Sequence, residues 1–178
     1  MDMKKILIIV IILLIIGVGA FYFLSSQPKT LKYDDHFSVT VPGNFETAEE
    51  NGSVSSAYPA NKSYAVTIHE EQDTNASDVE STYGILKGAQ NLSVVKDTIK
   101  DVKQYDVGKN KAYDLTTTDE TIIKEGKLDA KKVRSVSFVV PDSQKIYSLY
   151  FLTNDTSADL NTPEIESIIN STSPSTAK

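Results

Sequence analysis

One apolar segment near the N-terminus constrains this chain more than any other feature. Residues 6–24, ILIIVIILLIIGVGAFYFL, contain no charged side chain. As an α-helix, these 19 residues would be about 28 Å long, which is close to the thickness of the hydrocarbon core of a bilayer. Lys4 and Lys5 precede the segment, and basic residues favour the cytoplasmic side of a membrane. We therefore expect residues 1–24 to be a transmembrane signal anchor in the cell membrane, with the rest of the chain outside the cytoplasm.

A cleaved signal peptide is the alternative interpretation of the same segment. Val18-Gly19-Ala20 resembles the small-residue site of signal peptides, and cleavage near Ala20 would secrete the protein. The apolar run continues through Leu24, which favours the uncleaved anchor. The chain has no Cys, so a lipid-modified cysteine, disulfides and thiolate metal sites are excluded.

After the anchor, the sequence predicts one folded domain. Residues 25–30 form a short polar tether, residues 31–170 the domain, and residues 171–178 a Ser-, Thr- and Pro-rich tail that we expect to be disordered. Outside residues 1–24 the formal charge is −7. Such an acidic body has no electrostatic surface for nucleic acid, which we exclude as a partner.

Alternating apolar residues predict strands over most of the domain. Phe37, Val39 and Val41 alternate with polar residues, so residues 31–33 and 37–41 predict a first hairpin. Turn-forming Gly, Pro, Asn and Asp separate the remaining predicted strands. Residues 53–58 and 62–69 predict a second hairpin. Four longer strands are predicted over 93–105, 111–123, 127–140 and 144–152.

Two segments change to helical periodicity. Ser77 to Glu80 form a capping box before apolar residues at helical spacing, which predicts a helix over 78–90. Gly84 and Gly88 lie on that helix, and we expect them to pack closely onto the sheet. A second helix begins at Thr162-Pro163, an N-cap followed by Pro at the first helical position.

The fold class follows from the order of these elements. We predict an α+β domain in which an antiparallel β-sheet meander is flanked by helices on both faces, an α/β/α sandwich, preceded by one N-terminal transmembrane helix. Residues 146–152 are apolar or aromatic at nearly every position, which is typical of a central strand covered on both faces.

Three short strings in this order resemble a known family. They are Phe-Ser-Val-Thr-Val-Pro at 37–42, Ile-Tyr-Ser-Leu-Tyr-Phe at 146–151 and Glu-Ile-Glu-Ser-Ile-Ile at 164–169. The chain thereby resembles the Mog/PsbP-like α/β/α sandwich family over about 35–170. Members usually carry a Trp soon after the opening Pro, where this chain has Phe45. The resemblance implies a non-enzymatic domain that binds or helps assemble other proteins, and it carries over no site residue.

Six asparagines lie in Asn-x-Ser/Thr sequons, the acceptor pattern for N-glycosylation. They are Asn51, Asn61, Asn75, Asn91, Asn154 and Asn170. A glycosylated outer surface is one interpretation. The other is that Asn, Ser and Thr gather in turns and helix caps for local hydrogen bonding, which produces sequons without glycans.

Residues able to perform catalysis or to bind a metal do not converge in the sequence. His69, Glu70, Glu71 and Asp73 offer metal-binding atoms, but a strand points residue 70 away from its neighbours, which favours a solvated acidic strand end. The other histidine, His36, lies in a turn, and the chain has no G-x-S-x-G elbow or phosphate-binding loop. We therefore predict no catalytic residue, no metal site and no cofactor.

One basic cluster and one acidic cluster lie on predicted neighbouring strands. The basic residues are Lys127, Lys131, Lys132 and Arg134, and the acidic residues are Asp114, Asp119 and Glu120. We expect them to balance each other across a hairpin rather than to face an anionic partner. The tyrosines of the domain are expected to serve the core rather than a ligand stack.

These observations together predict a membrane-anchored extracytoplasmic module of the cell envelope that binds or assembles other proteins without catalysis. Its partner would be another envelope protein, met through the sheet edge or an exposed helix face. The alternatives are an envelope hydrolase or carbohydrate-active enzyme whose site the sequence hides, and a carrier of a small molecule or lipid.

Overall fold

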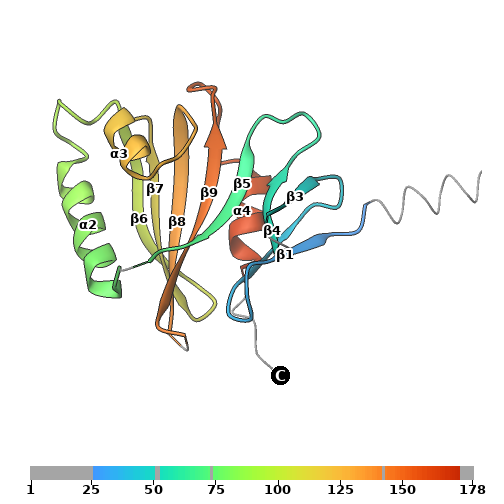
Figure 1. Ribbon diagram of the computed structural model, residues 1–178. Coiled ribbons are helices and arrows are strands. Elements are labelled where there is room, and N and C mark those ends of the chain that lie inside the picture. Colours follow the sequence, from blue (N-terminus) through green and yellow to red (C-terminus); the bar gives the residue numbers. More distant parts are fainter. Residues whose placement is uncertain (1–25, 51–52, 73, 142, 173–178) are drawn as a thin grey trace, which may run out of the picture.

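The computed structural model describes residues 26–50, 53–72, 74–141 and 143–172 (Figure 1). The predicted anchor at 6–24 lies outside these residues, as does the end of the tail, 173–178. None of the helices in the described ranges is both long enough and apolar enough to cross a bilayer.

Strands make up most of the described chain. They are β1 (Lys29–Lys32), β2 (Ser38–Val41), β3 (Glu46–Glu50), β4 (Ser53–Tyr58), β5 (Ala65–Glu70), β6 (Ile99–Val107), β7 (Asn110–Thr117), β8 (Lys132–Val140) and β9 (Lys145–Thr153). The helices are α2 (Ala76–Ala89), α3 (Glu120–Glu125) and α4 (Pro163–Asn170).

Seven of these strands form one sheet in the order β3-β4-β5-β9-β8-β7-β6, and every neighbouring pair is antiparallel. β6 to β9 follow each other as a meander, and β5 then pairs with the last of them. β1 and β2 form a separate two-stranded hairpin. The predicted α+β class with a mainly antiparallel sheet is therefore confirmed.

The core lies on both faces of the central strands. Ala112 and Tyr113 are neighbours on β7, so their side chains point to opposite faces of the sheet. Ala112 belongs to the apolar cluster that contains Ile165 and Ile168 of α4, whereas Tyr113 packs with Val79 of α2. α4 and α2 thus lie on opposite faces.

The two faces are covered unevenly, so a complete sandwich is not clearly formed. α2 contacts β6 and β7, at one side of the sheet, and stands away from β3 to β5 (Figure 1). On the face that α2 only partly covers, Ser137 and Ser148 are buried and hydrogen-bonded to each other at 2.9 Å. The other face is closed by α4 together with the β1–β2 hairpin.

Three predictions about local structure are wrong in part. The predicted strand over 111–123 ends at Thr117, and α3 follows, because Asp119 accepts hydrogen bonds from the N–H groups of Thr121 and Ile122 and caps a helix. The strand predicted over 93–105 begins only at Ile99.

The cap of α2 also differs from the prediction. Asn75, two residues before the predicted Ser77, is the N-cap, and its Oδ1 accepts from the N–H of Asp78 at 3.1 Å. Ser77 Oγ donates to the same oxygen. The predicted capping box of Ser77 and Glu80 is therefore wrong, although a helix begins within two residues of the predicted start.

Candidate functional site

The outer face of α2 is the candidate site with the clearest chemical signature. Three large hydrophobic side chains are exposed in the described part of the chain, and all three lie in or just after this helix: Ile85 is 69% exposed, Leu92 59% and Val94 87%. The other large hydrophobic side chains whose burial the structure describes are buried or partly covered. We call the exposed face of residues 81–88, together with Leu92 and Val94, the α2 surface.

Helical spacing explains why this face points to solvent. At about 100° per residue, Val79, Tyr83 and Leu86 lie on one side of α2, and they pack toward β6 and β7. Ile85 is out of phase with them, and Ser81 lies on the side opposite to Val79. One side of α2 therefore packs on the sheet, and the opposite side faces solvent.

The two glycines of α2 belong to this free side. A Cβ added at Gly84 or at Gly88 would meet no atom within 4 Å. The predicted close packing of these glycines onto the sheet is therefore wrong. They instead make the outer face of the helix flat, so that another surface can approach the backbone closely.

Charges of opposite sign lie toward the two ends of α2, beside the α2 surface. Glu80 and Lys87 are both exposed and seven residues apart, which places them nearly in line along one flank of the helix. Neither forms an ion pair within the described residues. The helix is thus acidic toward its N-terminus and basic toward its C-terminus.

Both edges of the main sheet are poor docking strands, in contrast to α2. β3 carries the exposed Glu46, and β6 carries several charged residues. Each edge strand also contains a register shift, between Ala48 and Glu49 in β3 and between Lys100 and Lys103 in β6. Charges and bulges are the usual protection against strand addition. The described edges of the sheet therefore present no unprotected strand, and contact through a sheet edge or through a helix face stays a prediction.

A hollow of about 660 Å³ lies beside the ends of β4, β5 and β9. Its walls include Tyr58, Lys62, Tyr64, Asp129, Asn154 and Asp155. Two polar groups of the lining are already engaged within the fold: Tyr64 Oη donates to Glu164 at 2.6 Å, and Thr153 Oγ1 donates to the carbonyl of Ser63 at 2.9 Å. The hollow has the volume of a small-molecule site, and both polar and apolar groups line it.

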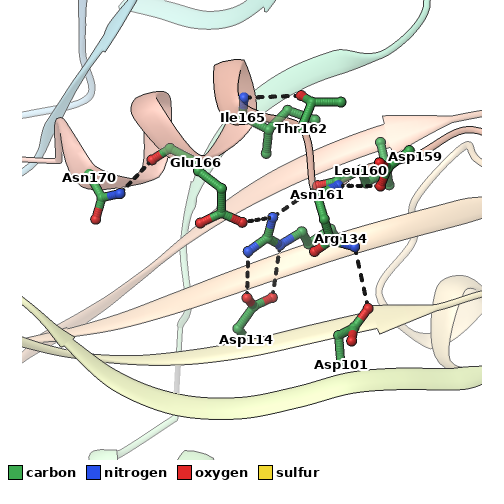
Figure 2. Close-up of polar contacts among 10 residues, drawn as sticks. All are labelled: Asp101, Asp114, Arg134, Asp159, Leu160, Asn161, Thr162, Ile165, Glu166 and Asn170. Carbon is green, nitrogen blue, oxygen red and sulfur yellow. Dashed lines mark hydrogen bonds and ion pairs between the residues drawn. The ribbon is translucent and has the colours of Figure 1, made fainter.

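Arg134 is the centre of a buried ionic network on the α4 face, which Figure 2 shows. Its guanidinium donates to both carboxylate oxygens of Asp114, at 3.1 and 2.7 Å, and to Glu166 of α4 at 2.6 Å. The same group donates to the carbonyl of Leu160. Burial acts to lower the pKa of Arg134, but Asp114 and Glu166 outweigh it and raise the pKa, so the charge is retained.

The basic and acidic clusters expected to face each other are therefore only partly paired. Arg134 binds Asp114 as predicted, across β7 and β8. Lys132 instead donates to the carbonyls of Thr156 and Ala158, and Glu120 pairs with Lys124 within α3. Because each partner lies within this chain, Arg134 ties α4 and the preceding loop to the sheet, which is a structural role.

A second polar contact fixes the β1–β2 hairpin against β9. Tyr147 Oη donates to Asp34 at 2.7 Å, while Lys145 contacts Asp34 and Glu70. Burial acts to raise the pKa of Asp34. The hydrogen bonds from Tyr147 and from two backbone N–H groups, with the Lys145 charge, outweigh burial and hold the pKa below its ordinary value.

The tyrosines of the domain mostly serve packing, as predicted. Tyr147 stacks on Phe37, Tyr64 contacts Phe45 and Phe151, and Tyr83 contacts Tyr113. Burial raises the pKa of Tyr83 to about 12. These rings are parts of the core rather than a stack open to a ligand.

The residues considered for a metal site are directed apart. Glu71 accepts a hydrogen bond from Tyr150 on one face of the sheet, and Glu70 binds Lys145 on the other. His69 is exposed, and Asp73 lies outside the described residues. Across the ranges that the structure describes, no three His, Asp or Glu side chains gather as metal ligands would.

Five of the six sequon asparagines are described, and all five are exposed: Asn61, Asn75, Asn91, Asn154 and Asn170. Asn51 lies outside the described residues. Asn61, Asn75 and Asn170 hydrogen-bond locally through their side chains, in a turn, an N-cap and the last turn of α4. The local chemistry that explains sequons without glycans is therefore present, and use of these sites stays a prediction.

Comparison with known proteins gives one described neighbour. No family model matches the chain, and no curated protein matches it. The fold is similar to the solution structure of cyanobacterial PsbP (CyanoP) from Synechocystis sp. PCC 6803, with 12% sequence identity and a TM-score of 0.46, over 85% of this chain and 93% of that one. The neighbour bears the name of the family that the sequence resembles. A similarity at this level carries no argument about function.

Proposed function

We propose that this chain is a membrane-anchored extracytoplasmic module of the cell envelope that binds a partner protein through the α2 surface and performs no catalysis. The proposal combines the anchor predicted at 6–24 with the exposed side chains of α2. A PsbP-like α/β/α arrangement and glycosylation of at least one of the sequon asparagines belong to the same proposal.

The gathering of exposed apolar side chains on the α2 surface is the observation that carries it. Ile85, Leu92 and Val94 lie within a segment of ten residues. Their burial against a partner would stabilise the complex through the hydrophobic effect. In a domain whose other large apolar side chains are covered wherever their burial is described, such a group is typical of an interaction surface rather than of incomplete packing.

The position of α2 fits an anchored protein. β1, the first described strand, contacts β4, whereas α2 contacts β6 and β7 at the other side of the sheet (Figure 1). Five strand spacings separate β4 from β6, which is about 24 Å. A chain attached to the bilayer through its N-terminus therefore keeps the α2 surface clear of its own attachment point.

Site-specific photocrosslinking in native membranes tests this proposal. A photoreactive amino acid replaces Val94 in the full chain, and the same probe at Lys62, an exposed residue beside the hollow, is the control. We expect a defined protein adduct from position 94 that Ile85→Asn weakens, and none from position 62. Equal adducts from both positions, or an adduct insensitive to Ile85→Asn, would contradict the proposal. The intact mass of the same protein reports cleavage near Ala20 and any glycans.

A second candidate function is a carrier for a small molecule, and the hollow beside β4, β5 and β9 favours it. Native mass spectrometry of the full chain released from its membranes tests this candidate. A bound molecule that is lost in Tyr58→Ala would support the carrier function. Recovery of the chain without adducts would remove it.

A further inference from the structure

We propose that the partner of the α2 surface is a second copy of this chain, bound so that the two α2 helices run antiparallel about a twofold axis. This inference rests on the proposed function and names the partner at the same surface. It starts from the outer face of α2, which no other described element covers.

The charges of α2 are complementary to themselves in this arrangement. The twofold axis is perpendicular to both helices and passes between them. It reverses the direction of the helix and places the same flank of each copy on the same side of the pair. With the axis between Tyr83 and Gly84, Glu80 of one copy lies opposite Lys87 of the other, and the pair occurs twice. Both side chains are exposed and have no ion-pair partner within the described residues.

Other arrangements of two helices lose this match. In a parallel pair the twofold axis runs along the helices, so the flanks that carry Glu80 and Lys87 would lie on opposite sides of the pair, and neither charge would meet one of opposite sign. An antiparallel pair also aligns the two helix dipoles favourably. The positive end of one dipole, at the N-terminus, lies beside the negative end of the other, at the C-terminus. The charge pattern thus selects one direction and one register.

The apolar residues and glycines fit the same register. Gly84 lies next to the axis, and its open Cβ direction allows the two backbones to approach closely. Ile85 then packs against the helix of the second copy near Ser81 and Thr82. Leu92 continues past the end of α2 and lies over the residues around Asn75 of the other copy.

This last contact links the pairing to glycosylation. Asn75 is an exposed sequon residue, and a glycan on it would occupy the space that Leu92 of the second copy needs. Pairing and a glycan at Asn75 therefore exclude each other, and a paired chain is expected to carry an unmodified Asn75.

Disulfide trapping tests the pairing directly because the chain has no Cys of its own. The full chain carrying Gly84→Cys is oxidised in its native membranes, with Ser167→Cys, an exposed residue of α4, as the control. We expect a disulfide-linked dimer from Gly84→Cys and none from Ser167→Cys. Glu80→Lys or Lys87→Glu in the Gly84→Cys chain should reduce the dimer about tenfold, because two attractive pairs become repulsive.

The double charge reversal decides the register. Glu80→Lys with Lys87→Glu restores the opposite charges in exchanged positions, and we expect it to restore the dimer. Failure of Gly84→Cys to cross-link, or failure of the double reversal to rescue, would overturn the inference. If the probe at position 94 still gives an Ile85-dependent adduct with another protein, the proposed function stands and only the second copy is excluded. If that adduct is also absent, both proposals fail.

Discussion

α2 and α4 are the two longer helices of the described domain, and they are held in opposite ways. α4 has 8 residues, and its Ile165, Ile168 and Ile169 are essentially fully buried. α2 has 14 residues, and only Val79 is buried. Each begins with a side-chain N-cap, Asn75 or Thr162, so the caps do not explain the difference. The comparison shows that the apolar stripe, rather than length or capping, decides how deeply a helix is bound to the sheet.

Polar contacts reinforce the same contrast. Glu166 and Glu164 connect α4 to Arg134 of β8 and to Tyr64. α2, in contrast, leaves Glu80 and Lys87 in solvent without an ion pair among the described residues. α4 is therefore a structural element of the domain, whereas α2 keeps both its charges and its outer apolar residues available for a partner.

Loss of Arg134 is expected to have the largest effect on stability. Arg134→Met leaves the buried carboxylate of Asp114 without its partner, which costs about 3–5 kcal/mol in the free energy of unfolding. Urea unfolding of the full chain in detergent, followed by circular dichroism, measures it. The control is Arg134→Met combined with Asp114→Leu, which removes the stranded charge and should recover most of the loss. A single variant as stable as the unchanged protein would mean that α4 is not held through this network.

Truncation of a buried isoleucine of α4 is expected to give the next largest loss of stability. Ile168→Ala removes a fully buried side chain and leaves a cavity in the main core, so we expect a loss of about 2–5 kcal/mol. The same unfolding measurement applies. Ser167→Ala, one residue earlier and exposed, is the control and should change the free energy of unfolding by less than about 0.5 kcal/mol. Similar free energies of unfolding for the two variants would mean that the side of α4 facing the core contributes no more to stability than its exposed side.

Acid should weaken the β1–β2 hairpin on the α4 face before it affects α2. The pKa of Asp34 lies below its ordinary value of 3.8 in the folded protein, so its contribution to stability is present above that pH and is lost as the pH falls through the lowered pKa. Asp34→Asn should cost about 1 kcal/mol at pH 7, and this cost should shrink as the pH falls through the lowered pKa of Asp34, as measured by urea unfolding across pH. Tyr147→Phe removes the same hydrogen bond and should flatten the pH dependence in part. If both variants keep the pH dependence of the unchanged protein, the ionised carboxylate of Asp34 does not stabilise the hairpin as proposed.

The sheet and α4 were predictable because their signals are local and consistent. The alternation at Phe37, Val39 and Val41 gave β2, and the Thr162-Pro163 cap gave the start of α4 to the residue. The second half of the predicted strand at 111–123 failed because apolar Ile122 and Ile123 fit a strand as well as a helix. The cap at Asp119 decided for the helix.

The α2 surface was not predicted, although the sequence holds its signal. Ile85 is out of phase with Val79, Tyr83 and Leu86, which marks it as a residue on the wrong side of an amphipathic helix. For Gly84 and Gly88 the sequence predicts contact with the sheet, because close packing is a common use of glycine. Which side of a helix meets the sheet depends on contacts distant in sequence, such as those of Tyr83 with Tyr113, and local spacing does not contain them.

The smallest expected effect on stability is the sharpest test of the comparison. Ile85→Ser lies on the free side of α2, so the free energy of unfolding should change by no more than about 0.5 kcal/mol. Leu86→Ser, one residue later on the side facing the sheet, is half-buried among Ile99, Val102 and Leu115 and should cost about 1–3 kcal/mol. Ile85→Ser should nevertheless weaken the adduct from position 94, because a hydroxyl replaces the apolar group that the partner buries. A variant that weakens the adduct without losing stability is a binding variant. If Ile85→Ser unfolds the domain as Leu86→Ser does, α2 is held on both sides, and its contrast with α4 disappears.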